Sequence, residues 1–161
     1  MVSYNQRLKT IKISDNYRFP HSVHAINACF GKNYKGWQRA GVHSLREGSD
    51  DFAWFPKLAI LKDGEEVAQD PIYGCVNTIS ADGTEIRESH SSADGRYETC
   101  IRYVFVKPAN GPYRYAGNFQ KDMDASTETL SIYRRISDEL DQSEWFYEPL
   151  APDTPIVYYQ E

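Results

Sequence analysis

Aromatic side chains stand beside glycine and basic residues at three places in this chain. The chain has 161 residues, of which 14% are aromatic, and the three places are residues 34–37, 53–57 and 113–119. Aromatic rings stack on unpaired nucleobases at about 1–3 kcal/mol each, and neighbouring Lys and Arg side chains hold phosphates. The pattern favours a nucleic-acid site with an aromatic base pocket. The alternative interpretation is an aromatic β core, in which the same rings only pack.

A base pocket also needs polar groups that hydrogen-bond the edge of an extruded base. A carboxylate or an amide near the aromatic segments would supply these groups. The predicted base-pocket residues are Trp37, Trp54, Phe55, Tyr113, Tyr115, Asn118, Phe119, Asp50 and Asp51. The amide and the two carboxylates are the polar members of this set, and the other residues supply ring faces.

The charges are divided unevenly along the chain. The formal net charge is −5, but residues 1–46 hold eight basic residues and one acidic residue, whereas the remaining 115 hold ten basic and 22 acidic residues. A basic segment on an acidic chain suits an anionic partner such as nucleic acid. The alternative is that these charges scatter over the surface and meet the acids of the other segment. The predicted contacts to the DNA backbone are Lys32, Lys35, Arg39, His43, Arg46, Lys57 and Arg114.

The sequence holds none of the common catalytic motifs. It has no glycine-rich phosphate loop followed by Lys-Ser/Thr, no His-Glu-x-x-His and no Gly-x-Ser-x-Gly. His21 and His24 have a spacing that occurs in metal sites, but no further ligand accompanies them. A metal-dependent nuclease would have to use Asp70, Glu85 and His90. We therefore predict a binding domain rather than an enzyme, with no catalytic residue, no metal and no cofactor, and keep the nuclease as an alternative.

The three cysteines, Cys29, Cys75 and Cys100, are odd in number and far apart. This pattern is neither a disulfide framework nor a zinc site, and it predicts reduced, mostly buried thiols in a cytosolic protein. No apolar run approaches the roughly 20 residues that span a bilayer, and the start lacks the apolar stretch of a signal peptide. We expect a cytoplasmic location and no membrane partner.

Short strands separated by turns account for most of the chain. Segments that alternate, or that are rich in β-branched and aromatic residues, are typical of strands. They occupy residues 7–13, 51–61, 72–79, 96–107, 113–119 and 130–136. Asp-Gly pairs at 63–64, 82–83 and 94–95 predict tight turns. Residues 22–30 fit either a strand or one helical turn, and 31–48 fit a long ordered loop.

This pattern predicts an α+β, mostly-β fold, a barrel or a sandwich with a few short helices. The length suits one domain, and no stretch has the composition of an interdomain linker. We assign residues 1–143 to a single β-rich DNA-binding domain. Residues 144–161 contain three prolines and form a C-terminal tail or an edge strand.

Two segments resemble the SRA (SET- and RING-associated) domain, a PUA-like β fold that reads 5-methylcytosine or 5-hydroxymethylcytosine. In the first, Phe30 and Gly31 are followed by Arg-Ala-Gly-Val-His-Ser at residues 39–44. The second, Gly-Pro-Tyr-Arg-Tyr-Ala-Gly-Asn-Phe at residues 111–119, resembles the late Tyr-Arg-Tyr-Asp-Gly strand of that family, with Ala116 in place of the aspartate. The resemblance implies a PUA/SRA-like twisted β-barrel.

The resemblance also implies a function. The chain would be a DNA-binding module that recognises a modified base, by flipping it into the aromatic pocket. It is similar to specificity modules of prokaryotic modification-dependent restriction systems, which work beside a separate nuclease. The implied partners are modified double-stranded DNA and a fused or associated nuclease domain, and the implied location is the prokaryotic cytoplasm near the nucleoid. The alternative is a β domain that binds a nucleotide-like small ligand or a protein, with little dependence on salt.

Overall fold

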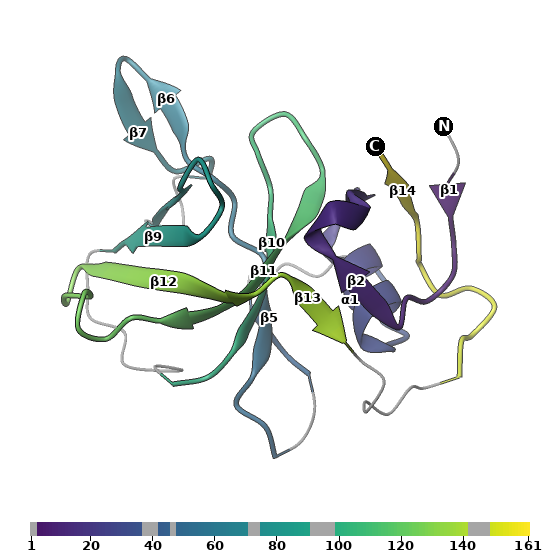
Figure 1. Ribbon diagram of the computed structural model, residues 1–161. Helices are drawn as coiled ribbons and strands as arrows, with labels where there is room; N and C mark the ends of the chain where they lie inside the picture. Colours follow the sequence, from purple (N-terminus) through teal and green to yellow (C-terminus); the bar gives the residue numbers. More distant parts are fainter. Residues whose placement is uncertain (1–2, 37–41, 46–47, 71–74, 91–98, 142–148) are drawn as a thin grey trace.

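A computed structural model describes residues 3–36, 42–45, 48–70, 75–90, 99–141 and 149–161 (Figure 1). Strands dominate the regular structure of this part of the chain. It holds one α-helix, α1 (Ser22–Phe30), and one short 3-10 helix, η1 (Ile13–Asp15). The predicted α+β, mostly-β class is therefore confirmed.

Ten strands form the main sheet. Its path is β1 (Ser3–Tyr4), β14 (Tyr158–Gln160), β3 (Tyr17–Phe19), β11 (Tyr113–Lys121), β10 (Arg102–Val106), β5 (Phe52–Trp54) and β4 (Val42–Ser44). From β11 the sheet branches through β12 (Leu130–Ser137) to β9 (Glu85–Ser89) and β8 (Val76–Ile79). Strands β10 and β5 run parallel, and the other described pairs of this sheet are antiparallel.

Strand β11 connects the two branches, because it pairs with β10, β3 and β12. Its register against β10 shifts at Ala116, and the next residue, Gly117, has a φ of +120°. A Cβ atom at Gly117 would lie 2.6 Å from Cδ of Arg135 and 2.9 Å from the carbonyl oxygen of Ser137. Only glycine combines this backbone conformation with so close an approach. The glycine therefore lets one strand bend between two parts of the sheet.

Two small sheets lie beside the main one. Strand β13 (Glu139–Asp141) pairs with β2 (Thr10–Lys12), and β6 (Ile60–Lys62) pairs with β7 (Glu65–Val67) in a hairpin that projects from the body (Figure 1). The hairpin turns at Asp63 and Gly64, whose φ values are +53° and +80°. This is the turn that the Asp-Gly pair predicts. The pair at 82–83 also forms a turn, and the pair at 94–95 lies outside the described residues.

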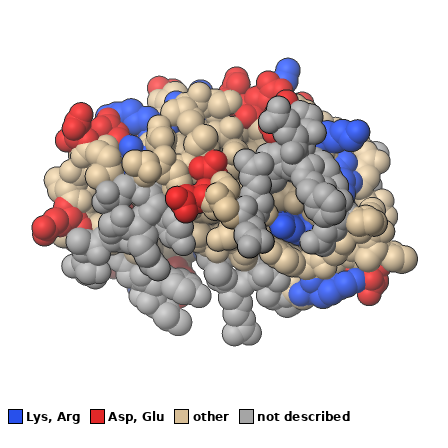
Figure 2. All heavy atoms as spheres, turned by 90° about the horizontal axis from the view of Figure 1, so that it is seen from below, with Lys and Arg blue, Asp and Glu red and all other residues tan. Residues whose placement is uncertain are grey.

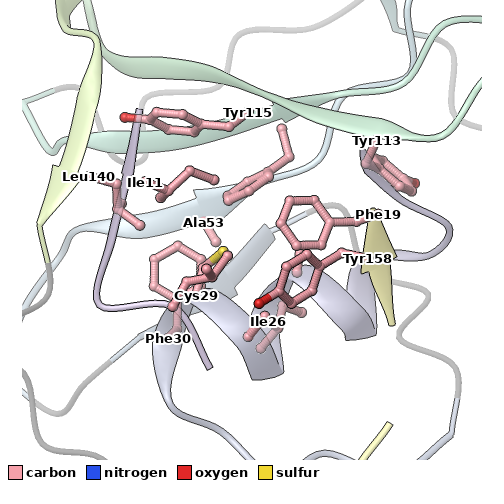
Figure 3. Packing of buried hydrophobic residues seen from close by; sticks show 14 of the residues in the cluster. Ile11, Phe19, Ile26, Cys29, Phe30, Ala53, Tyr113, Tyr115, Leu140 and Tyr158 are labelled. Carbon is pink, nitrogen blue, oxygen red and sulfur yellow. The ribbon is translucent and has the colours of Figure 1, made fainter. Parts of the chain in front are cut away.

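Helix α1 covers one face of the sheet and builds the first core. The helix contributes Ile26, Cys29 and Phe30, which pack against Phe19 and Tyr158 of the sheet (Figure 3). Eight of its nine residues are buried, so it lacks an exposed polar stripe. The prediction of a strand or a single helical turn for residues 22–30 is wrong for that reason, because amphipathic periodicity is the sequence signal for a helix. The helix ends at Gly31, which adopts the left-handed conformation.

A second core lies among β5, β10, β12 and β9. Its buried members are Phe52, Trp54, Ile86, Cys100, Val104, Val106, Ala116, Phe119 and Tyr133. Arg102 is 6% exposed and places its guanidinium carbon 4.7, 4.8 and 4.2 Å from the ring centroids of Phe52, Trp54 and Tyr133. Such cation–π contacts are strongest where water is excluded. We call these four residues the arginine cage.

The last described residues belong to the same fold. Strand β14 lies between β1 and β3, and Ile156 and Tyr158 are buried in the first core. Residues 137–140 include the end of β12 and part of β13. The proposed boundary after residue 143 lies in a stretch outside the described residues and stays a prediction.

Candidate nucleic-acid interface

The described aromatic members of the predicted base pocket are all buried. They are Trp54, Phe55, Tyr113, Tyr115 and Phe119, and each is at most 8% exposed. The Phe55 ring stacks on Phe105 with a centroid distance of 5.2 Å, and Tyr113 meets Phe55 edge-on at 5.5 Å. These rings pack as core residues, which is the alternative interpretation of the aromatic pattern. Their assignment to a base pocket stays a prediction, and Trp37 lies outside the described residues.

The polar members of that set hold the backbone or another side chain. Asn118 is 9% exposed, donates from its amide nitrogen to the carbonyl oxygen of Glu139 at 2.9 Å, and accepts from the Tyr115 hydroxyl at 2.6 Å. Asp51 accepts from the backbone N–H of Ile101 at 2.8 Å. Asp50 is exposed. The side chains of Asn118 and Asp51 therefore stabilise the fold around β5, β10 and β11.

The basic segment at the start of the chain meets acids from its end. Lys35 forms an ion pair with Asp153, and this contact lowers the pKa of Asp153. Lys32 is half-buried, and its carbonyl oxygen accepts from Arg7. On the face shown in Figure 2, Lys and Arg side chains lie among Asp and Glu side chains. Arg39 and Arg46 are outside the described residues.

The other predicted backbone contacts lie on different elements. His43, on β4, meets the Phe55 ring edge-on at 5.7 Å. Lys57 is exposed and lies opposite Lys107 in a parallel bridge, and burial together with the charge of Lys57 lowers the pKa of Lys107. Arg114 lies on β11 and is half-buried. Their contact with DNA stays a prediction.

A cavity of about 420 Å³ opens where β8 and β9 meet the segment that leads into the β6–β7 hairpin. Its lining residues are Leu58, Ala59, Glu66, Asn77, Thr78, Ile79, Ser80, Glu85 and Arg87. Leu58 and Ile79 also pack against the second core, and the other lining residues except Ala59 are polar or charged. The volume lies in the range of small-molecule sites. None of the predicted base-pocket residues that the structure describes lines it.

Asn77 is the lining residue with an unmet hydrogen-bonding requirement. It is 7% exposed, and its Oδ1 is buried without a hydrogen-bond partner in the described part of the chain. Its backbone carbonyl oxygen accepts from the N–H of Ala59 at 2.7 Å, which fixes the residue at the edge of β8. A buried acceptor left unpaired costs about 1–3 kcal/mol. A ligand N–H or O–H group that reached this oxygen from the cavity would supply the missing donor.

Two lining residues of the cavity, Glu85 and Arg87, belong to a network of ion pairs. Glu85 accepts from Arg87 at 3.1 Å and from Arg134 at 2.7 Å, and Arg134 also bonds Asp122 at 2.9 Å. The hydrogen bond from Arg87 lowers the pKa of Glu85, and the hydrogen bond from Arg134 lowers the pKa of Asp122. Both carboxylates are therefore ionised at neutral pH.

The residues of the nuclease alternative have other contacts. Glu85 belongs to these ion pairs, and His90 places Nε2 3.0 Å from the hydroxyl of Ser131. Asp70 is partly exposed. In the described ranges, no group of three or more His, Cys, Asp or Glu side chains is arranged to hold a metal ion.

Comparison with known proteins places the chain in a family. The model of the SET and RING associated (SRA) domain matches residues 4–142, which is most of the chain. The chain therefore belongs to the SRA domain family. The resemblance of the two sequence motifs is confirmed, and with it the assignment of the chain as a DNA-binding specificity domain for modified cytosine.

A solved structure has the same fold. It is "The 5-Hydroxymethylcytosine-Specific Restriction Enzyme AbaSI", with a TM-score of 0.63 and 23% sequence identity, covering 87% of this chain and 44% of that one. The chain thus spans less than half of that enzyme. The comparison with curated proteins finds no match. No described helix is long and apolar enough to cross a membrane.

Sequence reasoning missed Asn77. It stands in Val-Asn-Thr-Ile, where a single amide interrupts a β-branched strand. A polar residue inside an apolar strand is the signal that could have found it, since buried polar groups require partners. The cavity itself has no local signal, because its walls come from segments 58–66 and 77–87 and meet only in the folded chain.

Proposed function

We propose that this domain binds modified double-stranded DNA and takes the modified cytosine, flipped out of the helix, into the cavity beside β8. The observation that carries the proposal is that Asn77 lines the cavity and that its buried Oδ1 has no hydrogen-bond partner among the described residues. The exocyclic amino group of cytosine is a hydrogen-bond donor. A flipped base is read along its hydrogen-bonding edge, so this amino group would pair with Asn77.

Pairing with Asn77 would select cytosine over thymine. Thymine presents a carbonyl oxygen where cytosine presents the amino group, so with the amide in the orientation of the structure two acceptors would face each other. Leaving a buried acceptor unpaired costs about 1–3 kcal/mol, which corresponds to about 5- to 150-fold in affinity.

The wider setting of the domain is also a proposal. AbaSI is by its title a restriction enzyme, and this chain spans less than half of it. We infer that the domain supplies specificity to a nuclease carried on another domain or chain. A prokaryotic cytoplasm, close to the nucleoid, is the corresponding location.

Fluorescence anisotropy with short duplexes tests the proposal. The duplexes are unmodified, methylated and hydroxymethylated at one cytosine, and each is titrated at two salt concentrations. A further duplex carries thymine at the same position. We expect tighter binding to a modified duplex than to an unmodified one. Asn77→Leu, which has a similar volume but no acceptor, should lose the preference for cytosine over thymine. Asn77→Asp keeps the acceptor and should retain a preference.

Asn110→Leu is the matched control, because Asn110 is an exposed amide outside the cavity. This variant should bind like the wild type. A folded Asn77→Leu domain with the full wild-type preference would refute the role of Asn77. If no duplex binds even at low salt, DNA is not the partner and a small ligand or a protein takes its place.

A further inference from the structure

Two arginines lie opposite each other on the adjacent strands β3 and β11 of the main sheet. Arg18 on β3 and Arg114 on β11 are register partners in an antiparallel pair. Directly opposite residues in such a pair project from the same face, with Cβ atoms about 5 Å apart. Their chain neighbours Phe19, Tyr113 and Tyr115 are buried in the first core, so alternation directs both arginines to the opposite face.

The pair has too few counter-charges. Arg114 makes no hydrogen bond or ion pair with any described residue, and burial, followed by the charge of Arg18, lowers its pKa. Arg18 is 19% exposed, donates to the carbonyl oxygen of Tyr17 at 3.3 Å, and has Nε 3.4 Å from a carboxylate oxygen of Glu161, itself 57% exposed. Guanidinium groups remain charged in proteins. Two partly buried positive charges therefore face one loosely held carboxylate.

The arginine pair belongs to a row of residues that runs across strands β14, β3, β11 and β10. The next residue of the row is Tyr159 on β14, the register partner of Arg18. On the other side Arg114 is opposite Val106, which belongs to the second core. Leu58 and Ile79 of the cavity also pack against the second core, although no residue of the row lines the cavity. The row and the cavity therefore both contact the second core, through different residues.

We propose that Arg18 and Arg114 form a phosphate seat, in which two guanidinium groups bind one phosphate of the DNA backbone. The planar fork of arginine matches phosphate oxygens in a bidentate geometry. A bound phosphate would displace Glu161 and neutralise the like-charge pair. DNA as the source of the phosphate rests on the proposed function, whereas the anion site rests on the arginine pair alone.

Salt titrations of duplex binding test the seat. Arg18→Gln and Arg114→Gln should each weaken binding about tenfold to modified and unmodified duplexes alike, and reduce the slope of log affinity against log salt by about 1. Lys9→Gln is the matched control, because it removes one charge from an exposed side chain outside the row. Asn77→Leu should instead reduce the preference for cytosine over thymine and leave the salt slope unchanged. Wild-type affinity and slope in both arginine variants would overturn the proposal.

Thermal unfolding without DNA gives a second measurement. Inorganic phosphate, compared with chloride at equal ionic strength, should raise the Tm of the wild type and of Lys9→Gln, but not of either arginine variant. Arg114→Lys, which keeps the charge without the fork, should keep most of the salt slope and lose affinity. If both glutamine variants are unfolded at 25 °C, the pair is structural and the proposal fails. A phosphate effect without any DNA binding would keep the anion site and refute the DNA function.

Discussion

At the scale of the residue, Trp54 shows why an aromatic pattern cannot separate a core from a site. The same ring serves stacking on a base and packing in a β core, and neighbouring glycines and lysines do not decide between them. In the fold, Trp54 is 5% exposed, lies 5.0 Å from the Tyr133 ring and contacts Arg102. Three-dimensional neighbours, which local sequence does not contain, make the difference.

We predict that Trp54→Ala lowers the free energy of unfolding by about 3–5 kcal/mol, because it leaves a large cavity in the second core. Trp54→Phe should cost less, since it keeps part of the ring. Urea denaturation monitored by circular dichroism measures both. A Trp54→Ala domain of wild-type stability with weakened binding to modified DNA would favour the base-pocket assignment instead.

At the scale of the element, the predictions succeeded where local chemistry decides. The β-branched and aromatic segments became β10, β11 and β12, and the Asp-Gly pair of residues 63 and 64 became the β6–β7 turn. Helix α1 has no such signal. It is buried on nearly every side, so its sequence lacks the alternation of apolar and polar residues that marks an amphipathic helix. Likewise the place of β14 between β1 and β3 depends on the whole chain, not on its own residues.

The contact between α1 and the segment before β14 predicts a pH dependence. His24 accepts from the backbone N–H of Val157 through Nδ1 at 3.1 Å, and burial, followed by the nearby His21, lowers its pKa. The folded state thus favours the neutral ring. This contact contributes its full stabilisation above the histidine pKa of the unfolded chain, about 6.5. The contribution is lost as the pH falls through the lower pKa that His24 has in the folded state.

Urea unfolding at pH 7 and pH 5 measures this effect. We expect His24→Gln, which keeps an acceptor that does not titrate, to lose less stability between these pH values than the wild type. His43→Gln, which removes a histidine from β4, is the control and should behave like the wild type. Equal losses in wild type and His24→Gln would show that His24 does not set the dependence.

At the scale of the whole molecule, basic residues from the start of the chain are paired with acidic residues from its end. The net charge is −5, and Lys35 and Arg18 from the basic segment meet Asp153 and Glu161 near the end of the chain. Attraction for DNA must therefore come from particular groups and not from the overall field. The uneven distribution along the sequence could not reveal this, because residues distant in the chain are neighbours in the fold.

We predict that wild-type affinity for duplex DNA falls about 10- to 100-fold between 50 and 200 mM salt, as expected for a few phosphate contacts. Anisotropy titrations across this range measure the slope. Binding of duplex DNA that does not change with salt would contradict backbone recognition. It would support the alternative of a nucleotide-like ligand or a protein partner.

The arginine cage has a consequence for how relatives of this domain diverge. Phe52, Trp54, Arg102 and Tyr133 come from three strands, and each ring is in contact with one guanidinium. A buried arginine without its rings would be an uncompensated charge, and the rings without it would surround a void. The four positions should therefore evolve together. Homologues in which residue 133 is no longer aromatic should also have replaced the arginine at 102.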